Sequence, residues 1–264
     1  MENYLFIIPM CENKRLSPDS MVVRCVQSIR KYYPKTFILI INDSHQSITS
    51  DEIVKQFFKD TNLEAIHPEV QGSACAYALN YLNQCNRFNY AIILHDSTQL
   101  IKKFPNFDCD IKFLWFFTAH YVWDHSIVPP PRPPGINTHT DEIRKFYKNL
   151  QDSQFKKDFE TFYQKKDLWR GCFGNMIVIS KKYLTELDNK TKILSLTPFV
   201  KTRRDRMCME SIFAMAVFYT RTFDIRKDNL YAYEGDWCKA LIPKQFDTAH
   251  GVVGQYLIKY TCSR

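Results

Sequence analysis

Strand-like and helix-like segments alternate along residues 4–100, and this alternation limits the possible folds more than any other feature of the sequence. Short apolar runs, several rich in β-branched residues, are expected to be strands at residues 4–9, 36–41, 63–67 and 90–94. Segments with a helical pattern lie between them, at residues 20–33, 50–58 and 73–83. The alternation predicts an α/β fold with a mostly parallel central sheet flanked by helices.

Polar segments follow three of the expected strands at the point where each strand ends. They are residues 9–15, 42–44 and 95–97. In an open parallel sheet the carboxyl ends of the strands meet at one edge, and ligands bind there. We therefore expect these three segments, which are far apart in sequence, to form one ligand-binding edge.

The second half of the chain has a less regular pattern. Strands are expected at residues 113–117 and 176–179, a charged helix with a buried aromatic stripe at 141–166, an irregular Pro-rich loop at 129–135, and a largely buried helix at 206–218. No internal repeat is evident, and 264 residues suit one large domain. The sequence predicts a single domain over residues 1–264.

The composition excludes several classes of protein. Hydrophobic residues make up 45% of the chain, which indicates a globular protein. No apolar run is long enough to span a bilayer, and residues 1–4 lack the basic start of a signal peptide. The nine cysteines are scattered without a Cys-x-x-Cys pair, which favours reduced thiols and a cytoplasmic location over a structural zinc site.

Two aspartates on the predicted edge could carry chemistry. The carboxylate of Asp96 could bind a divalent metal that neutralises a diphosphate leaving group, or it could cap a loop. Asp43 could accept a hydrogen bond from a base N–H, or it could form an Asx-turn. His95 and Asp96 can reach one ligand only if the strand has ended before them, because successive strand residues point to opposite faces.

The order of elements over about residues 4–100 resembles the GT-A glycosyltransferase fold, and within it the family-2-like enzymes. The matching motifs are a first strand ending in Ile7, Ile8 and Pro9, an Asp-containing strand end at 42–44, a Gly-led small-residue helix at 72–82, and a strand ending at the Asp-x-Asp position at 92–97. Residues 171–180 resemble the acceptor-side stretch of that family more faintly.

The resemblance implies a Rossmann-like GT-A fold and the transfer of a sugar from a nucleotide-diphosphate sugar to an acceptor hydroxyl. The donor would be a UDP- or GDP-sugar and the acceptor a glycan or a protein. Residues 1–100 would form the nucleotide-sugar-binding half and residues 101–264 the acceptor-side half.

The resemblance also implies roles for individual residues. Asp43 would contact the base, and Asp96 and the late His250 would bind Mn²⁺ or Mg²⁺, with Mn²⁺ favoured. Apart from the resemblance, Pro9 and Arg15 are candidates for contact with the nucleotide. Arg15 and the basic cluster at 201–206 could bind phosphates, although a solvated loop is the default for that cluster. The sequence departs from the family pattern at Thr98, where an acid would complete the Asp-x-Asp motif. One carboxylate can suffice when the diphosphate and water molecules supply the other ligands.

A catalytic base for the acceptor hydroxyl would be a carboxylate in the second half. Glu210 is the first candidate, since an acid on an apolar helix is expected to be paired or functional. Its alternative role is a salt bridge to a neighbouring arginine, at position 203, 204 or 206. Asp236 is the second candidate, with a turn residue as its alternative.

Two other functions stay open from the sequence. A nucleotidyltransferase shares the sheet logic, but it usually has a Gly-rich loop after the first strand, and residues 10–15 contain no glycine. A non-catalytic GT-A-like module that binds a glycan or a protein is the other. The net charge of +8 suits phosphate-bearing ligands but does not select among them, and the dispersed basic residues do not favour nucleic acid.

Overall fold

The computed structural model of the chain describes residues 4–12, 14–104, 109–114, 116–118, 139–221, 252–253 and 257–259. Within these residues a six-stranded sheet has the order β3-β2-β1-β4-β9-β6. Its strands are β1 (Tyr4–Met10), β2 (Phe37–Asn42), β3 (Leu63–Ile66), β4 (Tyr90–Ile93), β6 (Ile111–Phe113) and β9 (Ile177–Ser180). The predicted α/β class with a mostly parallel sheet is confirmed.

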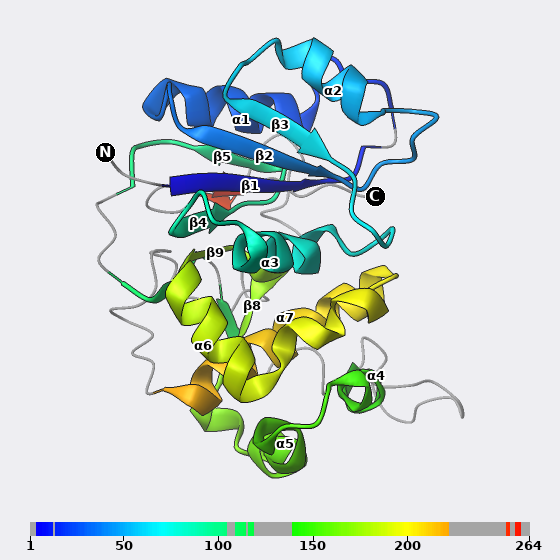
Figure 1. Cartoon of the computed structure of the whole chain (residues 1–264), viewed down its shortest axis with the longest axis vertical. Coiled ribbons are helices and arrows are strands. Elements are labelled where there is room, and N and C mark those ends of the chain that lie inside the picture. Colours follow the sequence, from blue (N-terminus) through cyan, green and yellow to red (C-terminus); the bar gives the residue numbers. More distant parts are fainter. Residues whose placement is uncertain are drawn as a thin grey trace.

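Four neighbouring strands, β3, β2, β1 and β4, run parallel, whereas β9 runs antiparallel between β4 and β6. The chain starts at β1, moves outward to β2 and β3, and returns on the other side of β1 as β4 (Figure 1). The direction of strand addition therefore reverses between β1 and β4. In open α/β sheets, such a reversal opens a crevice at the carboxyl ends of the strands.

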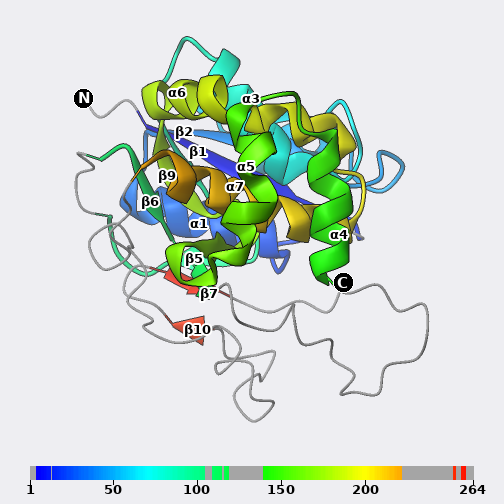
Figure 2. The ribbon, with the colours of Figure 1, turned by 90° about the horizontal axis from the view of Figure 1, so that it is seen from below.

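Helices cover both faces of this sheet (Figures 1 and 2). One face carries α1 (Met21–Tyr32) and α2 (Asp51–Phe58); the other carries α3 (Ala74–Gln84), α6 (Lys181–Thr191) and α7 (Arg203–Thr220), with α4 (His139–Phe146) and α5 (Gln154–Gln164) farther out. Alternate residues of β1 face opposite ways, so Phe6 and Ile8 pack with α1 while Leu5 and Ile7 pack with α3. Both faces are apolar because both are covered.

Two small sheets accompany the main one. β5 (Thr98–Leu100) pairs with β11 (Leu257–Lys259), which pairs with β10 (Val252–Val253), and β7 (Phe116–Thr118) pairs with β8 (Arg170–Cys172). Short 3₁₀ turns are η1 (Tyr147–Asn149), η2 (Lys166–Leu168), η3 (Phe173–Asn175) and η4 (Ile193–Phe199). The pairing of β11 with β5 places residues 257–259 beside the segment that follows residues 95–97.

Two sequence predictions in the second half need correction. The single helix expected at 141–166 is broken into α4, η1 and α5, because Leu150 is extended and Ser153 caps a new helix by accepting the Lys156 N–H. The strand expected at 113–117 is divided between β6 and β7. The aromatic stripe is core as expected, with Phe155 and Phe159 fully buried. The Pro-rich segment 129–135 lies outside the described residues.

A membrane-spanning helix is absent from the described part of the chain, since none of its helices is both long and apolar enough to cross a bilayer.

Candidate functional site

A small pocket of about 50 Å³ lies at the carboxyl ends of β1, β2 and β4, where the strand order reverses. Four segments that are distant in sequence and one residue of α7 line it. The lining residues are Pro9, Met10, Cys11, Asp43, Ala74, Cys75, His95, Asp96 and Arg206. Pro9, Asp43 and Asp96 were expected on one edge, and here they share one pocket, which we call the switch-point pocket.

Asp43 connects the end of β2 to the start of α3. Its own N–H donates to the Met10 carbonyl at 2.7 Å, and its Oδ1 accepts the Gly72 N–H at 2.7 Å. The Asx-turn considered for Asp43 is instead made by Asn42, whose Oδ1 accepts the Ser44 N–H at 3.2 Å. The Asp43 side chain is therefore directed across the sheet edge and not into its own loop.

Burial raises the pKa of the Asp43 carboxyl above its ordinary value. The N–H groups of Gly72 and Ala74 and the positive charge of Arg206 act in the opposite direction. Only 5% of Asp43 is exposed, so burial is the stronger effect. The residue is a buried acid held at the start of a helix, where partial positive charge collects.

His95 and Asp96 both line the switch-point pocket because β4 ends at Ile93. Asp96 is 4% exposed, and its Oδ2 accepts the Cys11 N–H at 3.3 Å. His95 places its Nε2 3.0 Å from the Gly174 carbonyl oxygen. His95 and Asp96 could reach one ligand only if the strand ended before them. This is the case, because side chains no longer alternate between the two faces beyond the end of β4.

Gly174 is required by this arrangement. Its φ is +62°, and a Cβ built there would lie 2.1 Å from Nε2 of His95. Any larger residue would therefore displace the imidazole from its place beside the end of β4. The 171–180 segment thus packs directly against the candidate site.

Thr98 does not line the switch-point pocket. It begins β5, it is fully buried, and its hydroxyl donates to Sδ of Met176 at 3.6 Å. An acid at position 98 would therefore sit in the core and not at the ligand edge. The turn after β4 therefore places position 98 away from the switch-point pocket.

The described side chains suit only one kind of metal ion. Within the described residues no group of three or more His, Cys, Asp or Glu side chains could enclose a metal. Asp96 offers one carboxylate, and Nε2 of His95 already faces a carbonyl oxygen. This donor set suits an ion that keeps its waters and is shared with a diphosphate, as Mg²⁺ commonly is, and not an ion caged by protein alone.

Arg206 lines the pocket from α7, and sequence reasoning did not single it out from its neighbours. From the sequence it was considered only as one member of the basic cluster at 201–206, which could bind phosphates or form a solvated loop, and as a partner of Glu210. In the described part of the chain its guanidinium forms neither a hydrogen bond nor an ion pair, and it is half-buried. Its charge acts on both Asp43 and Cys75. The sequence signal was its spacing of four from Glu210 on an apolar helix, which places both on one face.

Glu210 is half-buried on α7 and does not line the pocket. Its charge acts on the thiols of Cys75 and Cys172, so it lies on the side of α7 that faces α3 and β8. The salt bridge considered for it is not made with Arg203, Arg204 or Arg206 among the described ion pairs. Arg204 pairs with Glu142 at 2.7 Å instead.

Cys75 lies at the start of α3 with its Sγ 3.9 Å from Nε2 of His95. Burial raises the pKa of the Cys75 thiol to about 12. A thiol with this pKa stays protonated at neutral pH and is a poor nucleophile. The thiol–imidazole contact therefore does not make a catalytic pair.

Of the remaining sequence candidates, those in the described part of the chain do not line this pocket. Arg15 is exposed and does not line it. Trp169, a possible sugar-stacking residue, is buried and donates its Nε1–H to the Tyr163 carbonyl, as a core residue would. Asp236 and His250 lie outside the described residues.

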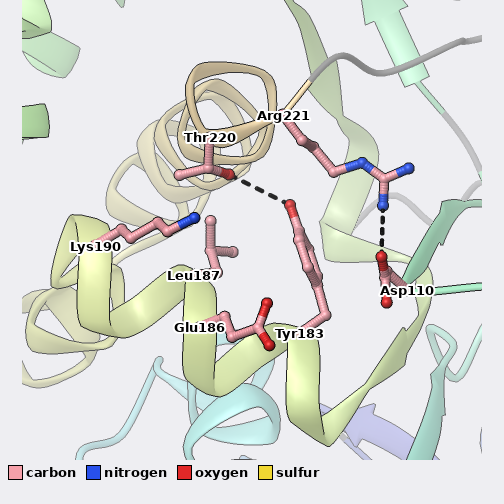
Figure 3. Close-up of a pocket in the computed structure, with 7 residues that line it drawn as sticks. All are labelled: Asp110, Tyr183, Glu186, Leu187, Lys190, Thr220 and Arg221. Atoms are coloured by element: carbon pink, nitrogen blue, oxygen red, sulfur yellow. Dashed lines mark hydrogen bonds and ion pairs between the residues drawn. The ribbon is translucent and has the colours of Figure 1, made fainter.

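A second pocket, of about 180 Å³, lies beside the C-terminal end of α7 (Figure 3). Arg221 pairs with Asp110 across it at 3.1 Å, and the hydroxyls of Tyr183 and Thr220 lie 3.4 Å apart. The Asp110 carbonyl accepts the Ser180 N–H. Ser180 is the register partner of Tyr90, the first residue of β4. This pocket is therefore at the amino-end edge of the parallel strands, where ligands of such sheets do not usually bind.

No protein-family model and no curated protein sequence matches the chain. Among solved structures, GalNAc-T7 with UDP, GalNAc and Mn²⁺ matches with 16% identity and a TM-score of 0.30, over 38% of this chain and 18% of that one. TarS residues 1–349 from S. aureus in complex with UDP matches with 15% identity and a TM-score of 0.28, over 39% and 29%. TarS 1–349 in a second crystal structure matches with 12% identity and a TM-score of 0.38, over 81% and 56%. The chain spans less than two thirds of the length of each of these structures, and similarity of this degree assigns neither a ligand nor a reaction.

Proposed function

We propose that the chain is a glycosyltransferase that moves a sugar from a UDP- or GDP-sugar to a hydroxyl of a glycan or protein acceptor. The observation that carries the proposal is the convergence of Asp43, Asp96 and Arg206 at the switch-point pocket. This pocket combines a strand-order reversal, a helix start and opposite charges, which suit a phosphate-bearing nucleotide. We propose one domain over residues 1–264 and a cytoplasmic location.

On the donor side, we assign different residues of the chain to different parts of the nucleotide. Asp43 has one oxygen on the Gly72 N–H, and we assign its other oxygen to an N–H of the base. Pro9 lines the pocket beside it, and we also assign the exposed Arg15, which lies outside the pocket lining, to the nucleotide. A pocket of about 50 Å³ holds only a small group, so the base and the sugar would extend from it along the sheet edge.

The leaving diphosphate needs positive charge. Asp96, with His250 as a proposed second ligand, would hold Mn²⁺ or Mg²⁺, and such an ion neutralises charge that develops on the departing phosphate oxygens. Asp96 itself is oriented by the Cys11 N–H, which fixes the end of β1 and the turn after β4 relative to each other.

On the acceptor side, a carboxylate must accept the proton of the attacking hydroxyl if the transfer inverts the anomeric centre. We assign this role to Glu210, with Asp236 as the second candidate. If the assignment holds, Glu210→Gln lowers the transfer rate while the dissociation constant of the donor nucleotide stays within about twofold, since removing one catalytic base typically costs 10²–10⁴-fold in rate.

Thermal unfolding with a panel of nucleotide sugars, in Mn²⁺ and in EDTA, tests the donor assignment. A donor at about 100 times its dissociation constant stabilises the folded state by about 2.7 kcal/mol, or roughly 5–10 °C for a chain of this size. The Mn²⁺-dependent part of the shift should disappear in Asp96→Asn. Mass spectrometry of an acceptor library incubated with the stabilising donor then identifies the product.

A non-catalytic module is the second candidate. Position 98 favours it, since a buried threonine stands where the Asp-x-Asp motif would have its second acid. Donor binding without transfer or donor hydrolysis would select the module. The absence of any thermal shift, in a folded sample, would reject both the donor assignment and the enzyme.

A further inference from the structure

The guanidinium of Arg206 has no partner in the described part of the chain, although it is half-buried in a polar pocket. Arg204, on the same helical turn, is mostly exposed and pairs with Glu142. The two arginines of this turn are therefore used differently: one makes a surface ion pair, and the other enters the pocket. A partly desolvated cation without an ion-pair partner is stabilised when an anion arrives.

The position of Arg206 is fixed by rigid parts of the fold. A capping box starts α7, in which the Thr202 hydroxyl accepts the Asp205 N–H and the Asp205 carboxylate accepts the Thr202 N–H. Gly72 packs against the backbone just before α7, since a Cβ at Gly72 would lie 2.2 Å from the Lys201 carbonyl oxygen. The start of α7 is thereby held against the start of α3, so the backbone that carries Arg206 needs little ordering when a ligand binds.

The opposite wall of the pocket also favours an anion, despite its two carboxylates. Ala74 and Cys75 belong to the first turn of α3, an eleven-residue helix whose N-terminus carries partial positive charge. Asp43 and Asp96 each accept a backbone N–H, and neither forms an ion pair with Arg206 among the described contacts. Arg206 is therefore not simply the counter-ion of either acid.

We infer that Arg206 binds the diphosphate of the nucleotide directly, so that the chain holds a nucleoside diphosphate without a divalent cation. The inference rests on the proposed function for the identity of the ligand. In this inference the guanidinium of Arg206 neutralises part of the diphosphate charge. A second acid at position 98 would instead support that neutralisation by helping to hold a metal ion. A guanidinium suits this role because its planar fork binds two phosphate oxygens at once.

Calorimetric titration of the full chain in EDTA tests the inference, with UDP, GDP, uridine, guanosine and inorganic pyrophosphate as separate probes. We expect one nucleoside diphosphate to bind in EDTA and its nucleoside to bind more weakly. Arg206→Gln should lower the affinity for the nucleoside diphosphate by on the order of 10- to 100-fold and leave the affinity for the nucleoside unchanged. Pyrophosphate alone should bind weakly, because it lacks the contacts of the base.

Arg203→Gln is the matched control, because Arg203 is an exposed arginine on the same turn and the substitution removes the same charge. It should change the affinity for the diphosphate by less than about twofold at 0.15 M salt. Arg206→Lys keeps the charge but loses the fork, and we expect an affinity between those of the wild type and Arg206→Gln. This variant also keeps the test possible if Arg206→Gln does not fold.

Three results would overturn the inference, and they separate it from the proposed function. Binding of UDP or GDP only after Mn²⁺ is added would reject the role of Arg206 but keep the donor assignment. Equal weakening of nucleoside and diphosphate in Arg206→Gln would show that Arg206 only shapes the pocket. A wild-type chain that binds neither nucleotide, with or without Mn²⁺, would reject the proposed function itself.

Discussion

Gly72→Ala perturbs the contact that holds the start of α7 against the start of α3. Gly72 has a φ of +93°, which residues with a side chain rarely adopt, and its missing Cβ leaves room for the Lys201 carbonyl. The added methyl would lie 2.2 Å from that oxygen and 2.6 Å from its carbon. Both are backbone atoms, so they cannot move aside as the end of a flexible side chain could.

The cost has two parts. A non-glycine residue held at such a φ costs about 1–3 kcal/mol, and forcing an extra methyl into a packed contact costs about 1–3 kcal/mol more. A total of about 4 kcal/mol corresponds to a decrease of about 12 °C in Tm for a chain of this size. Relief of the clash by movement of Lys201 would also shift Arg206, because only the four residues 202–205, which include the capping box, separate them.

Thermal unfolding measures the first effect, and titration with the nucleoside diphosphate at a temperature well below Tm measures the second. Lys201→Ala is the control, since the contact uses the backbone of Lys201 and its side chain is exposed. This control should leave both Tm and affinity nearly unchanged. A Gly72→Ala protein that unfolds within about 2 °C of the wild type, well below the shift calculated above, would refute the reasoning.

Three further predictions concern the pocket and its surroundings. Asp43→Asn tests the raised pKa of Asp43: ionising this buried acid costs stability, so the wild type should lose stability as the pH rises through that pKa. In thermal unfolding in EDTA from pH 4 upward, the Tm of Asp43→Asn should therefore rise relative to the Tm of the wild type. A difference in Tm that does not change with pH would contradict burial as the cause. Gly174→Ala should lower Tm by driving a Cβ into His95, and His95→Ala should recover part of that loss in the double variant; strictly additive losses would count against the contact. Thr98→Asp should unfold or strongly destabilise the chain by burying an acid, without a gain in Mn²⁺ affinity by calorimetry; a stable variant that binds Mn²⁺ more tightly would show that position 98 faces the ligand.

The strands and helices of residues 4–94 could be predicted because local pattern and burial agree there, whereas the short strand β5 at 98–100 was not predicted. The runs at 4–9, 36–41 and 90–94 are apolar since their strands are covered on both faces, and each is followed by polar residues at the sheet edge. The second half was harder to predict. A single capping serine at position 153 divides what periodicity presents as one helix.

The convergence of Pro9, Asp43 and Asp96 was determined by the sequence alone, because the carboxyl ends of parallel strands must meet at one edge whatever the details of packing. The tertiary structure decided the direction in which each side chain points. Asp43 faces Gly72 because α3 begins there, and Thr98 faces the core because β5 begins immediately after the turn.

The entry of Arg206 into the pocket was decided only by tertiary packing. More than a hundred residues separate Arg206 from every other residue that lines the pocket, and its position depends on the approach of Gly72 to the Lys201 backbone. Local sequence encodes the helix that carries Arg206 and the capping box that starts it. It does not encode which elements that helix meets, because that choice depends on how apolar surfaces from the whole chain pack into one core.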